Sequence, residues 1–145
     1  MGVFVSYASE DLEPVQDLVD DLTIRGLDVW FDQSEIDPGD DFVEEMKNGI
    51  EESDVVLICL SPSFEEKPPE SWVRDELRMA MLKEKDTLEK RIIPIRLNRG
   101  GDVPKELGTR AFVDLSSEEK RKRNFPRLIK AIKNAQNRAK RVVSA

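Results

Sequence analysis

The segment DVVLICLS (residues 54–61) is an almost unbroken apolar run, and it constrains the fold more than any other feature of the chain. A strand with one face in water alternates apolar and polar residues, whereas a strand buried on both faces of a parallel sheet does not. The run has a typical strand length and is too short for a buried helix. We therefore expect a central strand that helices cover on both sides.

Strand-like and helical patterns alternate along the rest of the chain. Further strands are expected at residues 3–7, 27–31, 91–97 and 111–115. Helices are expected at residues 12–26, which end at a glycine, at residues 42–53, after Pro69 and in the basic C-terminal segment. Such alternation requires crossover connections, so it predicts one parallel sheet with helices on both faces.

The 145 residues suit one domain with a single hydrophobic core. Histidine is absent and Cys59 is the only cysteine, inside the apolar run. These counts exclude Ser-His and Cys-His catalysis and His-ligated zinc within this chain, so no metal is expected. No apolar run approaches the roughly 20 residues of a membrane span, and no signal-peptide pattern opens the chain. A cytoplasmic location is therefore expected.

The charge is distributed unevenly. Residues 1–119 hold 13 Lys/Arg against 30 Asp/Glu, or −17, whereas residues 120–145 hold ten basic residues and no acidic one, or +10. Leu128, Ile129 and Ile132 recur at helical spacing there, which predicts a basic helix docked by its apolar side. Such a helix could bind nucleic acid or acidic lipid, but a solvated face that offsets the acidic body is the favoured interpretation. A nucleic-acid partner is therefore not expected.

Three polar loops follow the expected carboxyl ends of the first three strands. Their sequences are SYASEDL, DQSEIDPGDDF and SPSFEEKPPESW. Ligands of open parallel sheets bind beyond these ends, near the point where the strand order reverses. The first loop offers Ser9 or Asp11 as a helix cap, and the third leads into the next helix. We therefore expect the functional site among these loops.

The stretch PESWVRDEL places Trp72 and Glu76 four residues apart, so both would project from one face of a helix. Val73 and Leu77 already supply a core stripe, which makes the aromatic and carboxylate pair a candidate site. Taken alone, the tryptophan also suits an anchor packed against a loop, and the glutamate also suits an ordinary solvated helix position.

Five segments, in order, resemble the motifs of the TIR (Toll/interleukin-1 receptor) domains. They are VFVSYASED, GLDVWFDQSEIDPGDDF, SDVVLICLSPSF, SWVRDEL and RIIPIRL, and the match runs from about residue 3 to 133. The resemblance implies an α/β, flavodoxin-like fold of three layers, with a five-stranded parallel sheet in the order 2-1-3-4-5 and helices on both faces. It also implies a TIR domain over residues 1–136, with 137–145 as the end of a basic C-terminal helix or the start of a linker.

TIR domains of bacterial type that cleave NAD+ carry the pattern Trp-X-X-X-Glu after the third strand, and Trp72 and Glu76 have that spacing. The resemblance implies that Glu76 is catalytic and that NAD+ is the substrate, with no cofactor. The products would be nicotinamide and ADP-ribose or a cyclic ADP-ribose form, in signalling or defence. Nicotinamide leaves as a neutral base while positive charge develops on the ribose, which suits a lone carboxylate.

The family comparison also implies which residues contact NAD+. They are Trp72, Tyr7, Ala8, Asp32 and Ile36. Asp32 equally suits a turn residue at a strand end. Two positions depart from relatives, because Ala8 stands where some carry arginine and Glu35 where some carry lysine. These departures leave the contacts to the diphosphate and adenine open.

Residues Asp37, Pro38 and Gly39 fall in the loop that takes part in assembly in the family. The resemblance implies other TIR domains as partners, in head-to-tail assemblies that activate the enzyme. A non-enzymatic scaffold acting by the same homotypic contacts is the alternative. A phosphoacceptor receiver domain has a similar fold, but it needs an aspartate at the end of the third strand and a lysine at the end of a later one. This chain has Ser61 and the mid-strand Arg96 instead, which excludes that class.

Overall fold

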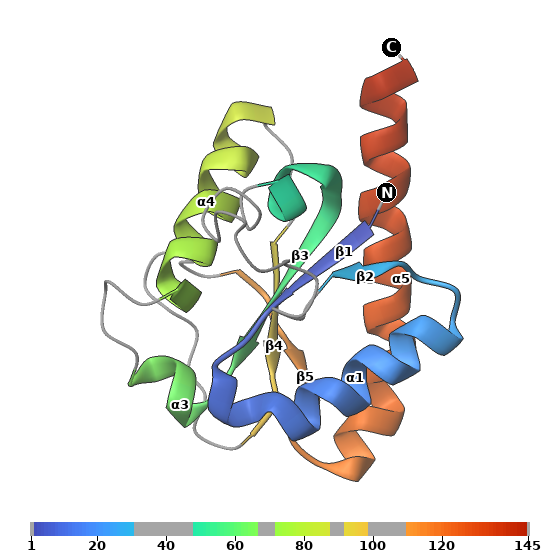
Figure 1. The fold of residues 1–145 in the computed structure, drawn as a ribbon. Helices are drawn as coiled ribbons and strands as arrows, with labels where there is room; N and C mark the ends of the chain where they lie inside the picture. Colours follow the sequence, from blue (N-terminus) through green and yellow to red (C-terminus); the bar gives the residue numbers. More distant parts are fainter. Residues whose placement is uncertain (1, 31–47, 67–71, 88–91, 99–109, 145) are drawn as a thin grey trace.

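The computed structural model describes residues 2–30, 48–66, 72–87, 92–98 and 110–144 (Figure 1). Its centre is one parallel sheet of five strands in the order β2-β1-β3-β4-β5. The strands are β1 (Gly2–Ser6), β2 (Val29–Trp30), β3 (Ser53–Leu60), β4 (Ile92–Arg96) and β5 (Val113–Asp114). The predicted fold and strand order are therefore confirmed. Within the described residues, β2 begins at Val29 instead of residue 27 and β5 covers only residues 113–114 of the predicted 111–115, since each edge strand pairs with only one neighbour. β4 ends at Arg96, so the expectation that Arg96 lies in mid-strand is wrong.

Helices follow the strands as predicted, except that two short helices, at residues 9–11 and 62–65, lie in segments that were expected to be polar loops. They are the 3-10 helix η1 (Ser9–Asp11), α1 (Leu12–Ile24), a helical segment at residues 48–52, α3 (Pro62–Glu65), α4 (Trp72–Thr87) and α5 (Glu118–Ser144). Gly26 ends α1 with a left-handed φ of 83°, which glycine adopts without strain. α5 continues through residue 136 without a break, so residues 137–144 extend the same helix. None of the described helices is long and apolar enough to cross a membrane.

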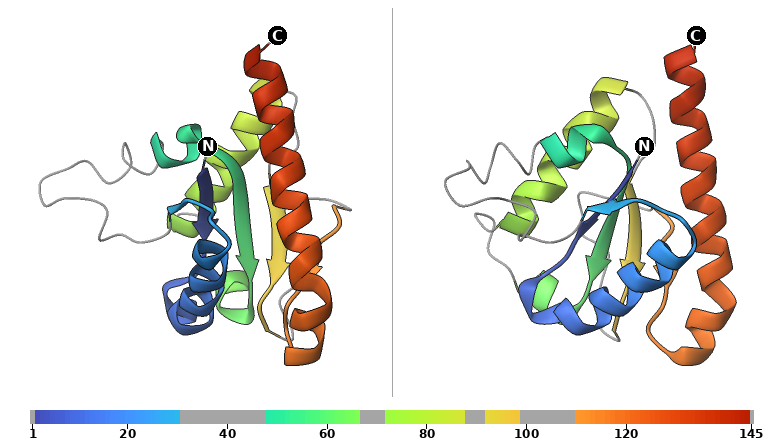
Figure 2. Two further views of the ribbon diagram at one scale, coloured as in Figure 1. Left: turned by 90° about the vertical axis from the view of Figure 1, so that its right-hand side faces the viewer. Right: turned by 45° about the vertical axis from the view of Figure 1, so that its right-hand side comes forward.

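The helices form one layer on each face of the sheet (Figures 1 and 2). α1 and α5 cover one face, and α4 covers the other. Alternate residues of β3 belong to two separate apolar clusters. Val55, Leu57 and Cys59 pack with α1 and α5, whereas Val56, Ile58 and Leu60 pack on the α4 side. The unbroken apolar run of β3 is thus explained by burial on both faces, as predicted.

Candidate functional site

The carboxylate of Glu76 lies at the carboxyl end of β1. Glu76 belongs to the second turn of α4 and is half-buried. Ser6, the last residue of β1, is fully buried, and its hydroxyl donates a hydrogen bond to Glu76 Oε1 across 3.3 Å. The predicted catalytic carboxylate is therefore held at the edge of the sheet where ligands of this fold class bind.

A second polar pair lies at the same edge of the sheet. The Ser61 hydroxyl, just after β3, donates to the buried carboxylate of Asp11 and accepts a hydrogen bond from the backbone N–H of Phe64 at 3.1 Å. Ser61 is thus the N-cap of α3. Asp11 stands at the N-cap position of α1, but its side chain makes no capping hydrogen bond there. The predicted capping role of Asp11 is therefore wrong, because its carboxylate is bound to Ser61 instead.

Cys59 lies fully buried in β3. Burial raises the pKa of its thiol far above the ordinary value, and the negative charges of Asp11 and Glu76 raise it further. The thiol therefore stays protonated at physiological pH and does not act as a nucleophile. Cys59 belongs instead to the apolar cluster that β3 shares with α1 and α5.

The structure places some of the other predicted site residues. Trp72 is the first residue of α4, one helical turn before Glu76. Ala8 is fully buried at the N-cap of η1, and Tyr7 is half-buried. Tyr7 packs against the cluster under α1 and α5, whereas the neighbouring Ser6 faces α4. The remaining predicted residues lie outside the described part of the chain: Asp32, Ile36, Asp37, Pro38 and Gly39.

Sequence reasoning did not assign Ser6, Asp11 and Ser61 to the site. Ser6 and Ser61 share a recognisable signal, since each is a small polar residue directly after an apolar strand. That signal marks the carboxyl end of a buried strand, but it does not identify the partner of the hydroxyl. Among the described residues, no group of three His, Cys, Asp or Glu side chains could hold a metal ion.

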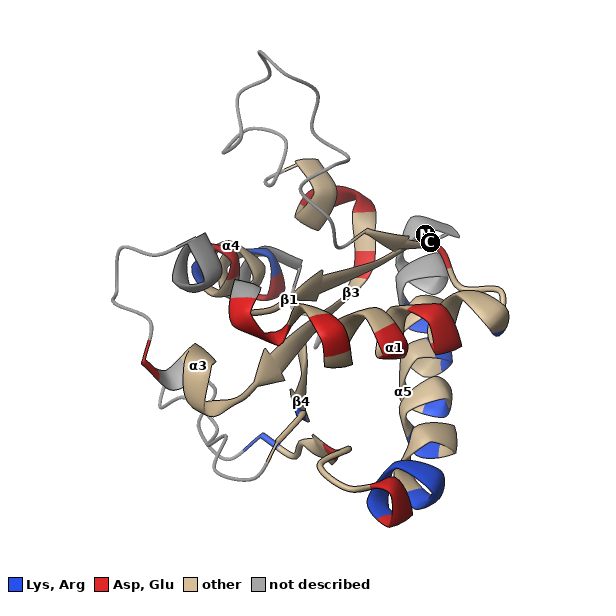
Figure 3. Cartoon of the chain, turned by 60° about the horizontal axis from the view of Figure 1, so that its bottom comes forward, with Lys and Arg blue, Asp and Glu red and all other residues tan. Residues whose placement is uncertain are grey.

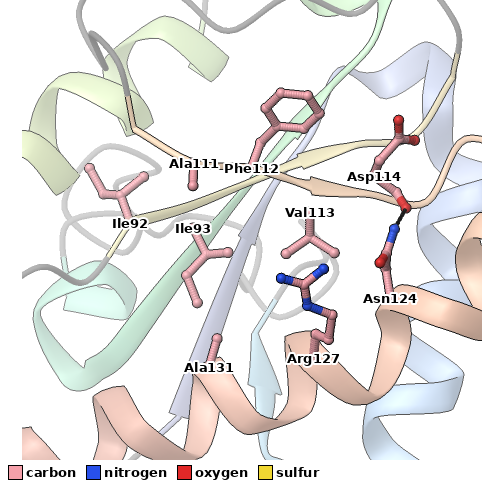
Figure 4. A pocket seen from close by; sticks show the side chains of 9 residues that line it. All are labelled: Ile92, Ile93, Ala111, Phe112, Val113, Asp114, Asn124, Arg127 and Ala131. Carbon is pink, nitrogen blue, oxygen red and sulfur yellow. Dashed lines mark hydrogen bonds between the residues drawn. The ribbon is translucent and has the colours of Figure 1, made fainter.

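Two pockets lie away from Glu76. The β5–α5 pocket has a volume of about 480 Å³ and opens beside the edge strand (Figure 4). It is lined by Ile92, Ile93, Ala111, Phe112, Val113, Asp114, Asn124, Arg127 and Ala131. The amino-end pocket, of about 520 Å³, lies where β1, β2 and β3 begin. Its lining includes Asp28, Trp30 and Glu52. Neither pocket includes Ser6 or Glu76.

The parallel sheet, its strand order and the polar site at the strand ends define a flavodoxin-like α/β domain. Residues 3–129 match the family model of the TIR domain, and the chain belongs to this family. The crystal structure of the TIR domain of the Toll-related receptor TRR-2 from Hydra magnipapillata superposes with a TM-score of 0.73. The two sequences are 27% identical, and the match covers 90% of this chain and 97% of that one.

Two curated relatives are enzymes by name. The chain is 33% identical over 93 residues to the 2′ cyclic ADP-D-ribose synthase BtTIR of Bacteroides thetaiotaomicron. The matched region covers 63% of this chain and 31% of that protein. It is 34% identical over 94 residues to the NAD(+) hydrolase TcpA of Theionarchaea archaeon (strain DG-70-1), and that match covers 64% of this chain and 27% of that protein. The chain thus spans about a third of the length of the curated relatives it matches.

Proposed function

We propose that this TIR domain is an NAD+ nucleosidase. It would cleave the bond between nicotinamide and ribose and release nicotinamide together with ADP-ribose or a cyclic ADP-ribose form. The names of the two curated relatives support this class of reaction. The observation that carries the proposal is the half-buried carboxylate of Glu76 at the carboxyl end of β1.

The proposed chemistry needs one anionic group beside the ribose. When the glycosidic C–N bond breaks, its electron pair goes to the ring nitrogen of nicotinamide, which leaves as a neutral base. The ribose is left with the positive charge of an oxocarbenium ion, and the carboxylate of Glu76 stabilises that charge and accepts hydrogen bonds from the ribose hydroxyls. Water then attacks and loses a proton, giving ADP-ribose, or a nucleophilic group of the same ADP-ribose attacks, giving a cyclic product.

The remaining substrate contacts are proposals from the family comparison. Trp72, one turn before Glu76, would form a wall beside the nicotinamide or ribose. Tyr7 and Ala8 follow the end of β1 and would line the same site. Asp32 and Ile36 would complete it from the loop after β2.

The test is nicotinamide release from NAD+ by the purified domain at high protein concentration, with Glu76→Gln as the variant. The substitution keeps the side-chain shape and removes the charge, so we expect the rate to fall by about 10²-fold or more. Circular dichroism should show an unchanged fold. Glu13→Gln, an exposed position on α1, is the matched control and should retain full activity.

Two results would contradict the catalytic assignment. An unaffected rate in Glu76→Gln would show that this carboxylate is not catalytic. No nicotinamide release by the wild-type domain, even when concentrated, would favour the alternative, a TIR scaffold that acts only by homotypic contacts.

We further propose that assembly between copies activates the enzyme. Residues 32–41, which contain Asp37, Pro38 and Gly39, carry five acidic residues and no basic one, together with the apolar Ile36. The β5–α5 pocket offers a partial complement, because its walls are mostly apolar and the guanidinium of Arg127 lies within it (Figure 4). The carboxylate of Asp114 also lines this pocket, but Ser116 and Lys120 bind it. A loop of one copy docked in this pocket of the next gives a head-to-tail contact, which produces open chains rather than closed dimers.

A further inference from the structure

We infer that Ser6 is a positioning residue for the Glu76 carboxylate; this inference rests on the proposed function. β1 alternates its side chains between the two faces of the sheet. Val3 and Val5 pack on the α1 and α5 side, and Phe4 packs on the α4 side. Ser6 is therefore the next position on the α4 face, where an apolar residue would have continued the core. The chain places a buried hydroxyl there instead.

The buried hydroxyl has one described partner. Ser6 has no exposed surface, and among the described residues its side chain bonds only to Glu76 Oε1. An ionised carboxylate only accepts hydrogen bonds, so Ser6 must be the donor. The separation of 3.3 Å is longer than that of a typical O–H···O bond, so the contact adds little to folding. Its effect is to direct one carboxylate oxygen toward the end of β1.

The orientation of the Glu76 carboxylate matters because a second carboxylate, that of Asp11, lies at the same end of the sheet. Asp11 and Glu76 are hydrogen-bonded to serine hydroxyls at the ends of the neighbouring strands β3 and β1, so two carboxylates share this end of the sheet. Each is supplied with a serine donor from a neighbouring strand end, Ser61 for Asp11 and Ser6 for Glu76. Without the Ser6 hydroxyl, the Glu76 carboxylate would lose a donor that fixes its orientation.

α4 itself is held by other contacts. Lys83 binds carbonyl oxygens at the end of helical residues 48–52, and Glu84 pairs with Arg110. Leu77 and Ala80 are buried in the apolar cluster on this face. Removing the Ser6 hydroxyl should therefore leave the helix in place and change only the setting of the carboxylate.

The test compares Ser6→Ala with wild type in two measurements. For nicotinamide release, kcat should fall about 10-fold while KM stays within about 2-fold, because misplaced reacting groups slow the chemical step. In a carbon-13 NMR titration of the Glu76 carboxyl, the midpoint should move to higher pH, because a hydrogen bond to the charged form has been removed. Ser6→Thr, which keeps a hydroxyl, should restore both values toward wild type.

The matched control is Ser53→Ala. Ser53 is also a buried serine of this sheet, but it lies at the amino end of β3, and its hydroxyl donates to the carbonyl oxygen of Gly49 at 2.6 Å. Its loss should leave both kcat and the Glu76 titration unchanged. If Ser6→Ala does not fold, Ser6→Cys replaces it in the test. A thiol is of similar size but is a weaker hydrogen-bond donor, so the midpoint of the Glu76 titration should move in the same direction by a smaller amount.

The inference and the proposed function fail separately. If the Glu76 titration and kcat are both unchanged in Ser6→Ala, Ser6 does not position the carboxylate. If the wild-type domain releases no nicotinamide, the proposed function fails, while the titration alone still decides whether Ser6 acts on Glu76. An equal loss of kcat in Ser53→Ala would show a general effect of buried hydroxyls and overturn the inference.

Discussion

At the scale of single residues, Asp114 shows how local donors set the charge of a carboxylate. Its side chain accepts hydrogen bonds from the backbone N–H of Ser116 at 3.0 Å and from the Ser116 hydroxyl at 2.5 Å. Lys120 lies 3.4 Å away. Burial alone would raise the pKa of Asp114, but the Ser116 hydrogen bonds and Lys120 outweigh it, so the pKa lies below its ordinary value. Asp114 therefore stabilises the fold in its charged form.

We predict that Asp114→Asn lowers stability at pH 7 by about 1–2 kcal/mol, because hydrogen bonds to a charged group are lost. A depressed pKa contributes stability that is fully present above the unfolded-state value of about 3.9 and is lost as the pH falls through the folded-state value. The difference in unfolding free energy between the variant and wild type should therefore shrink below about pH 4. Urea unfolding at pH 7 and at low pH measures this difference.

The control for Asp114 is Asp17→Asn, at an exposed position on α1 for which the described part of the chain gives no hydrogen bond or ion pair. It should change stability little at either pH. A deficit in Asp114→Asn that is the same at neutral and at acid pH would show that the charge is not its cause.

At the scale of elements, polar contacts near the C-terminal end of α4 hold this helix in place, and Glu76 with it. Lys83 Nζ donates to the carbonyl oxygens of Ile50 at 2.6 Å and Ser53 at 2.8 Å, and also to that of Glu51. These carbonyls end the helical segment at residues 48–52, where a cation is favoured. One turn of α4 is thereby attached to the chain that enters β3.

Glu84, the next residue of α4, makes a second attachment. Its Oε2 accepts from the backbone N–H of Ile92 at 2.6 Å, and its two oxygens accept from both terminal nitrogens of Arg110 at 2.7 and 2.9 Å. Bidentate pairs of this kind are well oriented. α4 is therefore joined to the start of β4 and to the segment that leads into β5.

We predict that Lys83→Met destabilises the domain by about 1–3 kcal/mol, because part-buried carbonyl oxygens lose a charged donor while the apolar stem is retained. Thermal unfolding followed by circular dichroism measures the loss. Lys130→Met removes a lysine from the exposed side of α5 and should leave the midpoint nearly unchanged. Equal midpoints for Lys83→Met and wild type would mean that these hydrogen bonds do not hold α4.

At the scale of the whole molecule, charge is separated between neighbouring helices. Figure 3 shows acidic residues along α1 and basic residues along α5. An ion pair between Asp21 and Arg121, 2.6 Å apart, joins the two helices. The expected docking of the basic helix by an apolar side is confirmed, since Leu128, Ile129 and Ile132 are buried in the cluster it shares with α1.

We predict that Arg127→Glu weakens self-association by about 10-fold, corresponding to about 1.4 kcal/mol, because it places like charge in the pocket proposed to receive the acidic loop. Sedimentation over a range of concentrations measures the association. Specific activity in nicotinamide release should rise with concentration in wild type and less steeply in the variant. Added salt should weaken the wild-type association as well.

Lys133→Glu is the matched control for charge. Lys133 is an exposed residue of α5 that does not line the β5–α5 pocket, and its reversal changes the net charge by the same amount. Equal weakening by both variants would indicate a general charge effect instead of docking in this pocket. Specific activity that stays constant with concentration, with a monomer throughout, would argue against activation by assembly.

Much of the fold was predictable because its signals are local. An apolar run of strand length, amphipathic spacing in the segments of α1 and α5, and Gly26 after α1 each act within a few residues. The same spacing places Trp72 and Glu76 one turn apart on α4, as the structure has them. Whether these two act on NAD+, and whether Asp32, Ile36 and residues 37–39 contribute, stay predictions.

The sequence by itself thus determined the order of strands and helices, the burial of β3 on both faces and the helix that carries Glu76. Only the tertiary structure decided the surroundings of that carboxylate. Ser6 and Glu76 are 70 residues apart in the chain, and Asp11 and Ser61 are 50 apart. Local patterns carry no information on such pairs, because a hydroxyl at a strand end can serve any acceptor that the packing brings to it. The parallel sheet brings the ends of β1 and β3 together, and that arrangement selects the partners.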